Sequence, residues 1–178
     1  MDKKIIYSIF TICLIMAGLL VAIILADTVP NAGGAPHPDL PGMQVGGDGA
    51  ARLQYIGGYA FLFQALLLTL AVCLSILGVS PRYRSKEFFS YMAASLAFML
   101  LAWWQMYSRH QAFLETGETN YFMGFPIATA WQVYGTWLGA IPLILVYSIG
   151  FRKFIYSKED EAEFQNILDQ YGSKKDDP

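Results

Sequence analysis

Residues 53–80 read LQYIGGYAFLFQALLLTLAVCLSILGVS, and this stretch contains no Asp, Glu, Lys, Arg or His. A helix rises 1.5 Å per residue, so a run of ~20 uncharged, mostly apolar residues is long enough to cross the ~30 Å hydrocarbon core of a bilayer. The apolar residues do not alternate with polar ones, as they would in a transmembrane β-strand. The stretch therefore predicts a transmembrane α-helix.

Three further stretches lack charged residues and His in the same way, at 5–26, 88–108 and 120–151. The chain of 178 residues is 55% hydrophobic and 15% aromatic, with a mean hydropathy of +0.39, more than a soluble domain of this length needs for its core. We expect an all-α integral membrane protein. Its transmembrane domain covers 1–156, with helices at about 5–26, 54–80, 88–108 and 127–151.

The first stretch has an alternative interpretation as a secretory signal. Lys3 and Lys4 form a basic start, and residues 24–26 (Ile, Leu, Ala) faintly resemble a cleavage site. The apolar run of about 22 residues is longer than the 7–15 residues expected of a signal peptide core, and the Ile is a poor small residue for cleavage. An uncleaved anchor is the preferred interpretation.

Lys and Arg gather on one side of the four predicted spans. That side holds Lys3, Lys4, Arg82, Arg84, Lys86, Arg152, Lys153 and Lys158, and the other side holds Arg52 and Arg109. The positive-inside rule then predicts that both termini are cytoplasmic. We expect a multi-pass protein of the cell inner membrane in this orientation, and the Tyr and Trp residues near the span ends agree with it.

Two outer loops follow from this orientation, at 27–53 and 109–126. The first is rich in Pro and Gly and has no periodicity, so we expect a meandering loop that builds no core of its own. His37 in this loop could ligate a metal. No second His or Cys stands at ligand spacing, however, and a solvated loop residue is the simpler interpretation.

The uncharged spans narrow the range of functions. A haem between transmembrane helices needs an axial ligand in a span, and a proton pathway needs ionisable residues there. Cys13 and Cys73 have no CxxC partner, and we interpret them as packing residues. A formal net charge of -2 gives no broad basic surface for nucleic acid. We expect neither an enzyme nor a self-sufficient pump, and no cofactor or metal.

Small residues at helical spacing mark the fourth span. Gly135 and Gly139 form a GxxxG pair, with Ala128 and Gln132 in the preceding turns. Helices associate in lipid through close approach over small residues and through hydrogen bonds between helices. We interpret these four residues as contacts to partner helices, with packing inside the chain as the equal alternative.

The C-terminal segment, 157–178, predicts a short amphipathic cytoplasmic helix. Ser157 is a good N-cap, with Asp160 three residues later. The apolar residues Phe164, Ile167, Leu168 and Tyr171 recur at i, i+3, i+4 and i+7. The segment carries three Lys against seven Asp and Glu, so it does not suit an anionic lipid surface. We expect the stripe to dock on protein, either a loop of this chain or a partner, with a solvated tail as the alternative.

The last predicted hairpin, 88–156, resembles the small two-helix membrane subunits that accompany sodium:solute symporters. The matching residues are Gly124, Pro126, Trp131, Gln132, Tyr147 and Arg152. They form a Gly-x-Pro entrance, an aromatic helix that contains Gln, and an aromatic and basic end. The resemblance covers less than half of the chain. It implies an accessory role beside a transporter.

These patterns together predict a non-catalytic accessory or scaffolding subunit of a larger inner-membrane complex, in contact with lipids and with a larger membrane protein. The complex could be a transporter, a respiratory or a photosynthetic assembly. One alternative is a redox subunit that binds quinone or haem at the outer face, near His110 and Trp104. Another is a neutral-solute channel that assembles from copies of this chain over Gly135 and Gly139.

Overall fold

The computed structural model describes residues 2–29, 33–47 and 49–173. Its spans are α1 (Asp2–Ile24), α2 (Gly49–Gly78), α3 (Lys86–Thr116) and a fourth that joins α4 (Ile127–Ala130), a π-helical turn (Trp131–Gly135) and α5 (Thr136–Ser148). Each of these four is long and apolar enough to cross a membrane. The prediction of four such helices is confirmed.

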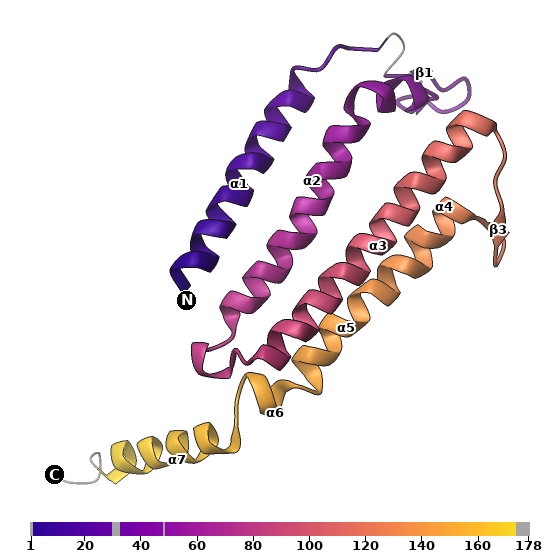
Figure 1. Cartoon of the computed structure of the whole chain (residues 1–178). Coiled ribbons are helices and arrows are strands. Elements are labelled where there is room, and N and C mark those ends of the chain that lie inside the picture. Colours follow the sequence, from indigo (N-terminus) through magenta and orange to yellow (C-terminus); the bar gives the residue numbers. More distant parts are fainter. Residues whose placement is uncertain (1, 30–32, 48, 174–178) are drawn as a thin grey trace.

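The four spans form an open row rather than a closed bundle (Figure 1). α1 packs on α2, α2 packs on α3, and α3 also carries the whole fourth span. We call the end with the start of α1 and the α2–α3 connection the base, and the end with the β-hairpins the rim. No residue in the most apolar window of α1 is buried. This outermost helix therefore keeps most of its apolar surface open to its surroundings.

Two helices extend beyond the limits that the charge pattern predicts. α3 continues to Thr116, through the first part of the outer loop expected at 109–126, and α2 begins at Gly49, inside the loop expected at 27–53. Charged residues mark where a helix leaves the apolar layer, whereas its end depends on capping. α3 ends at Thr116 and is capped by Gly117, which has a φ of 71° and donates its N–H to the Phe113 carbonyl.

The connection between α2 and α3 caps both helices. It consists of a short turn, η1 (Pro81–Tyr83), followed by Arg84 and Ser85. The buried Arg84 guanidinium donates to the carbonyls of Val79 at 2.8 Å and Leu77 at 3.1 Å, which lack helical donors at the end of α2. Ser85 Oγ accepts the Phe88 N–H at 3.1 Å and so caps α3.

The hydrophobic core lies at the base, where α2 ends, α3 begins and the fourth span ends. Its buried members are Val72, Val79, Phe88, Met92, Val146 and Phe154. The rings of Phe88 and Phe154 pack with centroids 5.4 Å apart. Phe154 belongs to the short helix α6 (Phe151–Phe154), so this core ties α6 to the spans.

Both connections at the rim contain a two-stranded antiparallel hairpin. β1 (Ala35–Pro36) pairs with β2 (Gln44–Val45), and β3 (Tyr121–Phe122) pairs with β4 (Phe125–Pro126). In the second hairpin, Met123 and Gly124 have φ angles of 48° and 83°, as the tightest hairpin turn requires. The pairing of β1 with β2 gives the Pro/Gly-rich first loop a defined turn. In the second loop, Gly124 supplies one of the left-handed positions before the fourth span.

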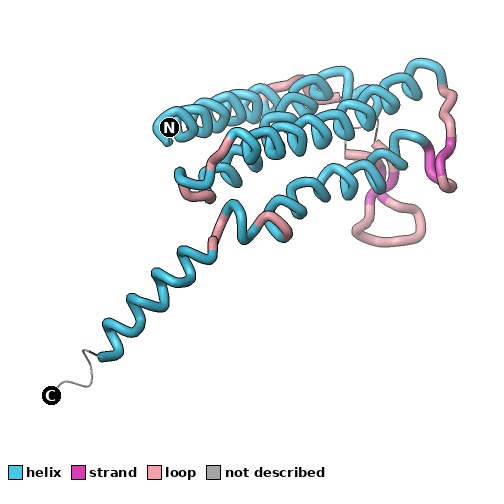
Figure 2. The backbone as a smooth tube through the Cα atoms, turned by 60° about the horizontal axis from the view of Figure 1, so that its bottom comes forward, coloured by secondary structure: helices cyan, strands magenta, loops and turns pink. Residues whose placement is uncertain are grey.

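A last helix, α7 (Lys158–Ser173), follows α6 and projects away from the base (Figure 2). The expected C-terminal helix is therefore present, and it is amphipathic in sequence. Residues 174–178 of the predicted acidic tail lie outside the described part of the chain.

Candidate partner-contact surface

Gly135 and Gly139 are buried against α3 of the same chain. A Cβ atom on Gly139 would lie 3.4 Å from Met99 Cγ, and one on Gly135 would lie 3.5 Å from the Cβ of Ala102. The absence of a side chain lets α3 and α5 approach closely. Of the two interpretations that the sequence left open for these residues, the structure shows the packing inside the chain. They serve packing inside the chain, and a channel seam over the same pair would have to open this contact.

The other two residues proposed on the fourth span are less enclosed. Ala128 is half-buried in α4, which packs on α3, whereas Gln132 is exposed on the π-helical turn. That turn brings the Trp131 ring over Gly135, where a Cβ would meet Trp131 Cε3 at 2.6 Å. Short π-helical segments occur mostly as single turns inside α-helices. Of the four residues, only Gln132 faces outward fully.

His110 and Trp104 do not form a joint site. They lie six positions apart on α3, which separates them by about 120° around the helix and about 9 Å along it. Trp104 is exposed and meets Phe61 of α2 edge-on, with ring centroids 6.0 Å apart. No group of three His, Cys, Asp or Glu side chains suited to a metal is found in the described part of the chain. The geometry adds nothing to the redox alternative.

His37 has a structural part in the first rim connection. Its Nδ1 accepts the backbone N–H groups of Asp39 at 3.0 Å and Leu40 at 3.2 Å. The ring thereby closes the turn that joins β1 and β2, much as an Asx side chain would. His37 is thus a partly exposed loop residue whose ring also holds the turn.

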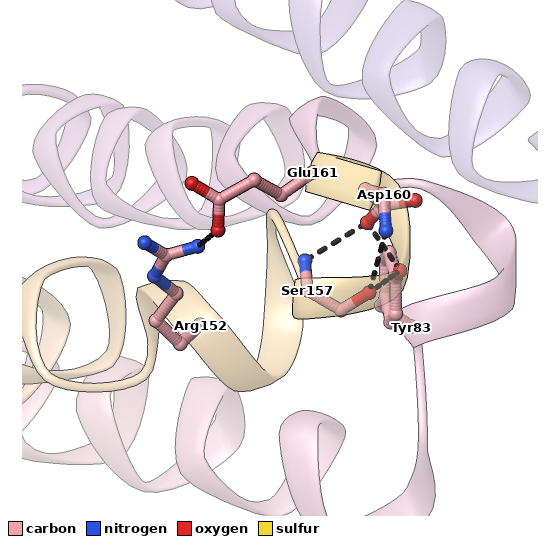
Figure 3. A network of polar contacts seen from close by, with 5 residues as sticks. All are labelled: Tyr83, Arg152, Ser157, Asp160 and Glu161. Carbon is pink, nitrogen blue, oxygen red and sulfur yellow. Dashed lines mark hydrogen bonds and ion pairs between the residues drawn. The ribbon is translucent and has the colours of Figure 1, made fainter. Parts of the chain in front are cut away.

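At the base, a network of polar contacts fixes the start of α7 (Figure 3). Ser157 Oγ accepts the Asp160 N–H at 3.2 Å, and the Asp160 carboxylate accepts the Ser157 N–H at 2.9 Å. This reciprocal pair is the capping arrangement expected from the sequence. The Asp160 carboxylate also accepts the Tyr83 hydroxyl and pairs with Arg82, and both partners lie in η1.

A second ion pair joins the short helix α6 to α7. Arg152 Nη1 lies 2.6 Å from Glu161 Oε2, and both side chains are about half exposed. A single exposed ion pair contributes little, about 0–1 kcal/mol. Here it acts with the contacts of Asp160, whose side chain is only 10% exposed. The direction of α7 is thus set by its first turn.

The first turn of α7 also favours ionised carboxylates. The N–H of Glu159 and the Ser157 hydroxyl hold the pKa of the Glu159 carboxyl below its usual value. Unpaired backbone N–H groups at a helix N-terminus attract negative charge for the same reason. The Glu159 carboxylate therefore stabilises this end of α7 in its charged form.

The apolar stripe of α7 is open. Its four residues have exposed fractions of 51% for Phe164, 45% for Ile167, 48% for Leu168 and 72% for Tyr171. None of them is buried by the described part of the chain, so the predicted docking on a loop of this chain does not occur there. A helix whose start is fixed and whose apolar face is exposed presents a defined surface, which we call the α7 stripe.

The sequence showed the cap of α7 but not what holds it. Asp160 is more than seventy positions away from Arg82 and Tyr83, and only the fold brings η1 beside α7. A usable signal was present in the charges, because a basic connection at 82–86 and basic α6 residues stand against the acidic start of α7. Such complementarity at one end of a bundle predicts pairing, although not which residues pair.

Comparisons with protein family models, with curated proteins and with solved structures find no match to this chain. The interpretation of its function therefore rests on residue chemistry and geometry. The strongest geometric feature is the α7 stripe. The interior of the row contributes packing, whereas the stripe is an apolar surface in a fixed position.

Proposed function

We propose that this protein is a non-catalytic accessory subunit that docks on a larger integral membrane protein, with the α7 stripe as its main contact outside the spans. The observation that carries the proposal is the contrast within α7. Several polar and ionic contacts fix its first turn, whereas its apolar residues are exposed. Large apolar surfaces that remain exposed on a folded chain are typical of interaction sites.

The charge of α7 argues for protein rather than lipid as the partner. Its described part carries Glu159, Asp160, Glu161, Glu163 and Asp169 against Lys158. Amphipathic helices that lie on anionic leaflets have basic polar faces. An acidic helix suits a partner groove with an apolar floor and Lys or Arg at its edges.

The spans supply a second, weaker support. α1 packs only at the edge of the row, and Gln132 on the fourth span faces outward with a polar side chain. Polar side chains at membrane depth favour contact with other helices. Partner helices beside the row would cover both features, so docking would involve the membrane as well as α7.

We place the base on the cytoplasmic side of the inner membrane. The base has eight Lys or Arg residues, Arg84 included, whereas the rim has Arg52 and Arg109. The positive-inside rule favours this orientation. α7 would then meet its partner in the cytoplasm. The resemblance of 88–156 to symporter accessory subunits makes a transporter one candidate partner, beside respiratory and photosynthetic complexes.

The test is co-purification from native membranes in a mild detergent, with a matched pair of substitutions. Leu168→Asp places a charge in the α7 stripe, and Asn166→Asp places the same charge on the opposite face. Burying a Leu side chain contributes about 1.5–3 kcal/mol, so Leu168→Asp should weaken a docked complex at least about tenfold.

The expected result is one stoichiometric membrane partner that is retained by Asn166→Asp and lost by Leu168→Asp. An absorption spectrum of the same eluate identifies any coloured partner. A lone, monodisperse chain from gently solubilised membranes would contradict the proposal, and so would a partner that both variants retain equally.

A further inference from the structure

A cavity of about 390 Å³ opens at the base between α3 and the fourth span. Its walls include Tyr91 and Ser95 from α3 and Pro142, Leu145 and Ile149 from the α5 side. Its volume falls in the range of ~300–1,000 Å³ that is usual for pockets that hold small molecules. It is separate from the α7 stripe, and the proposed function does not use it.

The depth of this cavity is apolar. Besides Glu87 and Tyr91, its α3 wall contains the polar residue Ser95. The Ser95 hydroxyl is already used, because Oγ donates to the Tyr91 carbonyl at 2.8 Å. Leu145 and Ile149 remain 46% and 78% exposed, so the cavity opens sideways toward the surroundings of the spans. The groups available for contact there suit a hydrocarbon chain.

The mouth of the cavity carries one cation and one anion. Lys153 Nζ donates to Glu87 Oε1 at 2.7 Å and to Oε2 at 2.6 Å, and the Tyr91 hydroxyl donates to Oε1 at 3.1 Å. An ammonium has three donors, and a carboxylate has about four acceptor positions. Each partner therefore keeps about one position for a further bond. Both side chains are about half exposed.

The pair also lies where lipid headgroups would be. Glu87 is in the first turn of α3, and Lys153 is in α6, directly after the fourth span. The apolar part of the cavity extends from this level into the spans, along Leu145 and Pro142. The order of charge at the mouth and hydrocarbon in the depth matches the order within a phospholipid molecule.

We infer that this cavity is a binding site for a phospholipid with a primary ammonium headgroup, as in phosphatidylethanolamine. The headgroup phosphate accepts the remaining Lys153 N–H, the headgroup ammonium donates to Glu87, and an acyl chain fills the cavity beside Leu145 and Ile149. Phosphatidylglycerol offers no cation to Glu87, and the quaternary ammonium of phosphatidylcholine has no N–H to donate. Charge and hydrogen-bond complementarity thus favour phospholipids with a primary ammonium headgroup over the other two.

The test is native mass spectrometry of the full-length protein in mild detergent, titrated with phosphatidylethanolamine, phosphatidylcholine or phosphatidylglycerol of identical acyl chains. We expect one equivalent of phosphatidylethanolamine to bind most tightly. Lys153→Met and Glu87→Gln should each weaken it about fivefold, the upper range for an exposed charge pair. Arg152→Met and Glu161→Gln are matched controls, because they break the neighbouring ion pair outside the cavity, and they should leave the affinity unchanged.

The position of the acyl chain has its own readout. Phosphatidylethanolamine with a photoreactive acyl chain should label peptides of α5 and the first half of α3, and unlabelled phosphatidylethanolamine should compete. The inference is overturned if the three lipids bind equally, if phosphatidylglycerol binds most tightly, or if the cavity and control variants lose affinity alike. Labelling spread over all spans, α1 included, would show an annular lipid layer and would also overturn it.

Discussion

Replacing Gly135 by alanine places a methyl carbon 2.6 Å from Cε3 of the Trp131 ring, a separation that non-bonded carbon atoms do not tolerate. The ring has to move, and the π-helical turn that holds it has to adjust. Overpacking of this kind costs about 1–3 kcal/mol. Removing a helical glycine returns about 0.5–1 kcal/mol. The balance predicts a net loss of about 1 kcal/mol in the free energy of unfolding.

Two other glycines make the comparison sharp. A Cβ atom on Gly139 would meet Met99 Cγ at 3.4 Å, and this flexible side chain can shift by a few tenths of an ångström. Gly139→Ala should therefore be close to neutral. Gly18 in α1 has nothing within 4 Å of the added carbon, so Gly18→Ala should be neutral or gain up to about 1 kcal/mol.

The measurement is unfolding of the purified full-length protein by titration with a denaturing detergent, for all three variants. The predicted order of stability is Gly18→Ala, then Gly139→Ala near the native chain, then Gly135→Ala. Combining Gly135→Ala with Trp131→Leu should recover part of the loss, because the clash disappears. Equal stability of Gly135→Ala and Gly18→Ala would refute the contact between Trp131 and Gly135.

Three further predictions concern α7 and the orientation of the chain. Asp160→Asn removes the carboxylate that pairs with Arg82 and caps α7. Amide hydrogen exchange along α7 should therefore accelerate, while exchange in α3 stays unchanged. Equal protection of α7 in the variant and the unsubstituted protein would contradict its fixation by the first turn. The pKa of Glu159 is lowered from an ordinary value of 4.5, so its stabilisation of α7 is complete above that pH and is lost as pH falls through the lowered pKa. Amide exchange in the first turn of α7 should rise in this acidic range. Glu159→Gln should remove this pH-dependent part of the rise. Glu118→Cys near the rim should react with a membrane-impermeant thiol reagent from outside intact cells, whereas Asn166→Cys in α7 should react only after the membrane is opened, and the reverse pattern would invert the proposed orientation.

The spans were predictable because charge-free stretches report the bilayer directly. Their ends were not, as α3 shows. Arg109 and His110 mark the exit from the apolar layer, but α3 continues to Thr116 and stops where Gly117 supplies a left-handed cap. Charge reports the environment of a helix, whereas its length follows from capping and from residues that keep helical hydrogen bonds in water.

The partner-contact residues divide for a related physical reason. The small residues Gly135 and Gly139 predict close approach of a helix, and a helix does approach, but it is α3 of the same chain. The spacing of small residues predicts which face of a helix is closely approached, but not which helix approaches it. The stripe from Phe164 to Tyr171 follows its prediction as a helical face, and only the structure shows that no described residue buries it.

The base network marks a further limit. The cap formed by Ser157 and Asp160 is local, and it could be predicted because the two residues are three positions apart in the sequence. The contacts of Asp160 with Arg82 and Tyr83 join segments far apart in the chain. They depend on how the packing of the spans brings η1 and α7 together at the base. The pairing of Lys153 with Glu87 has the same origin.

The most direct test of the central claim is site-specific photo-crosslinking in native membranes. A photoreactive amino acid replaces Leu168 in the α7 stripe, and the same amino acid replaces Asn166 on the opposite face as the control. Docking through the stripe predicts one discrete adduct with a larger integral membrane protein from position 168 and little or none from position 166. No protein adduct from either position, or equal yields from both, would contradict the account.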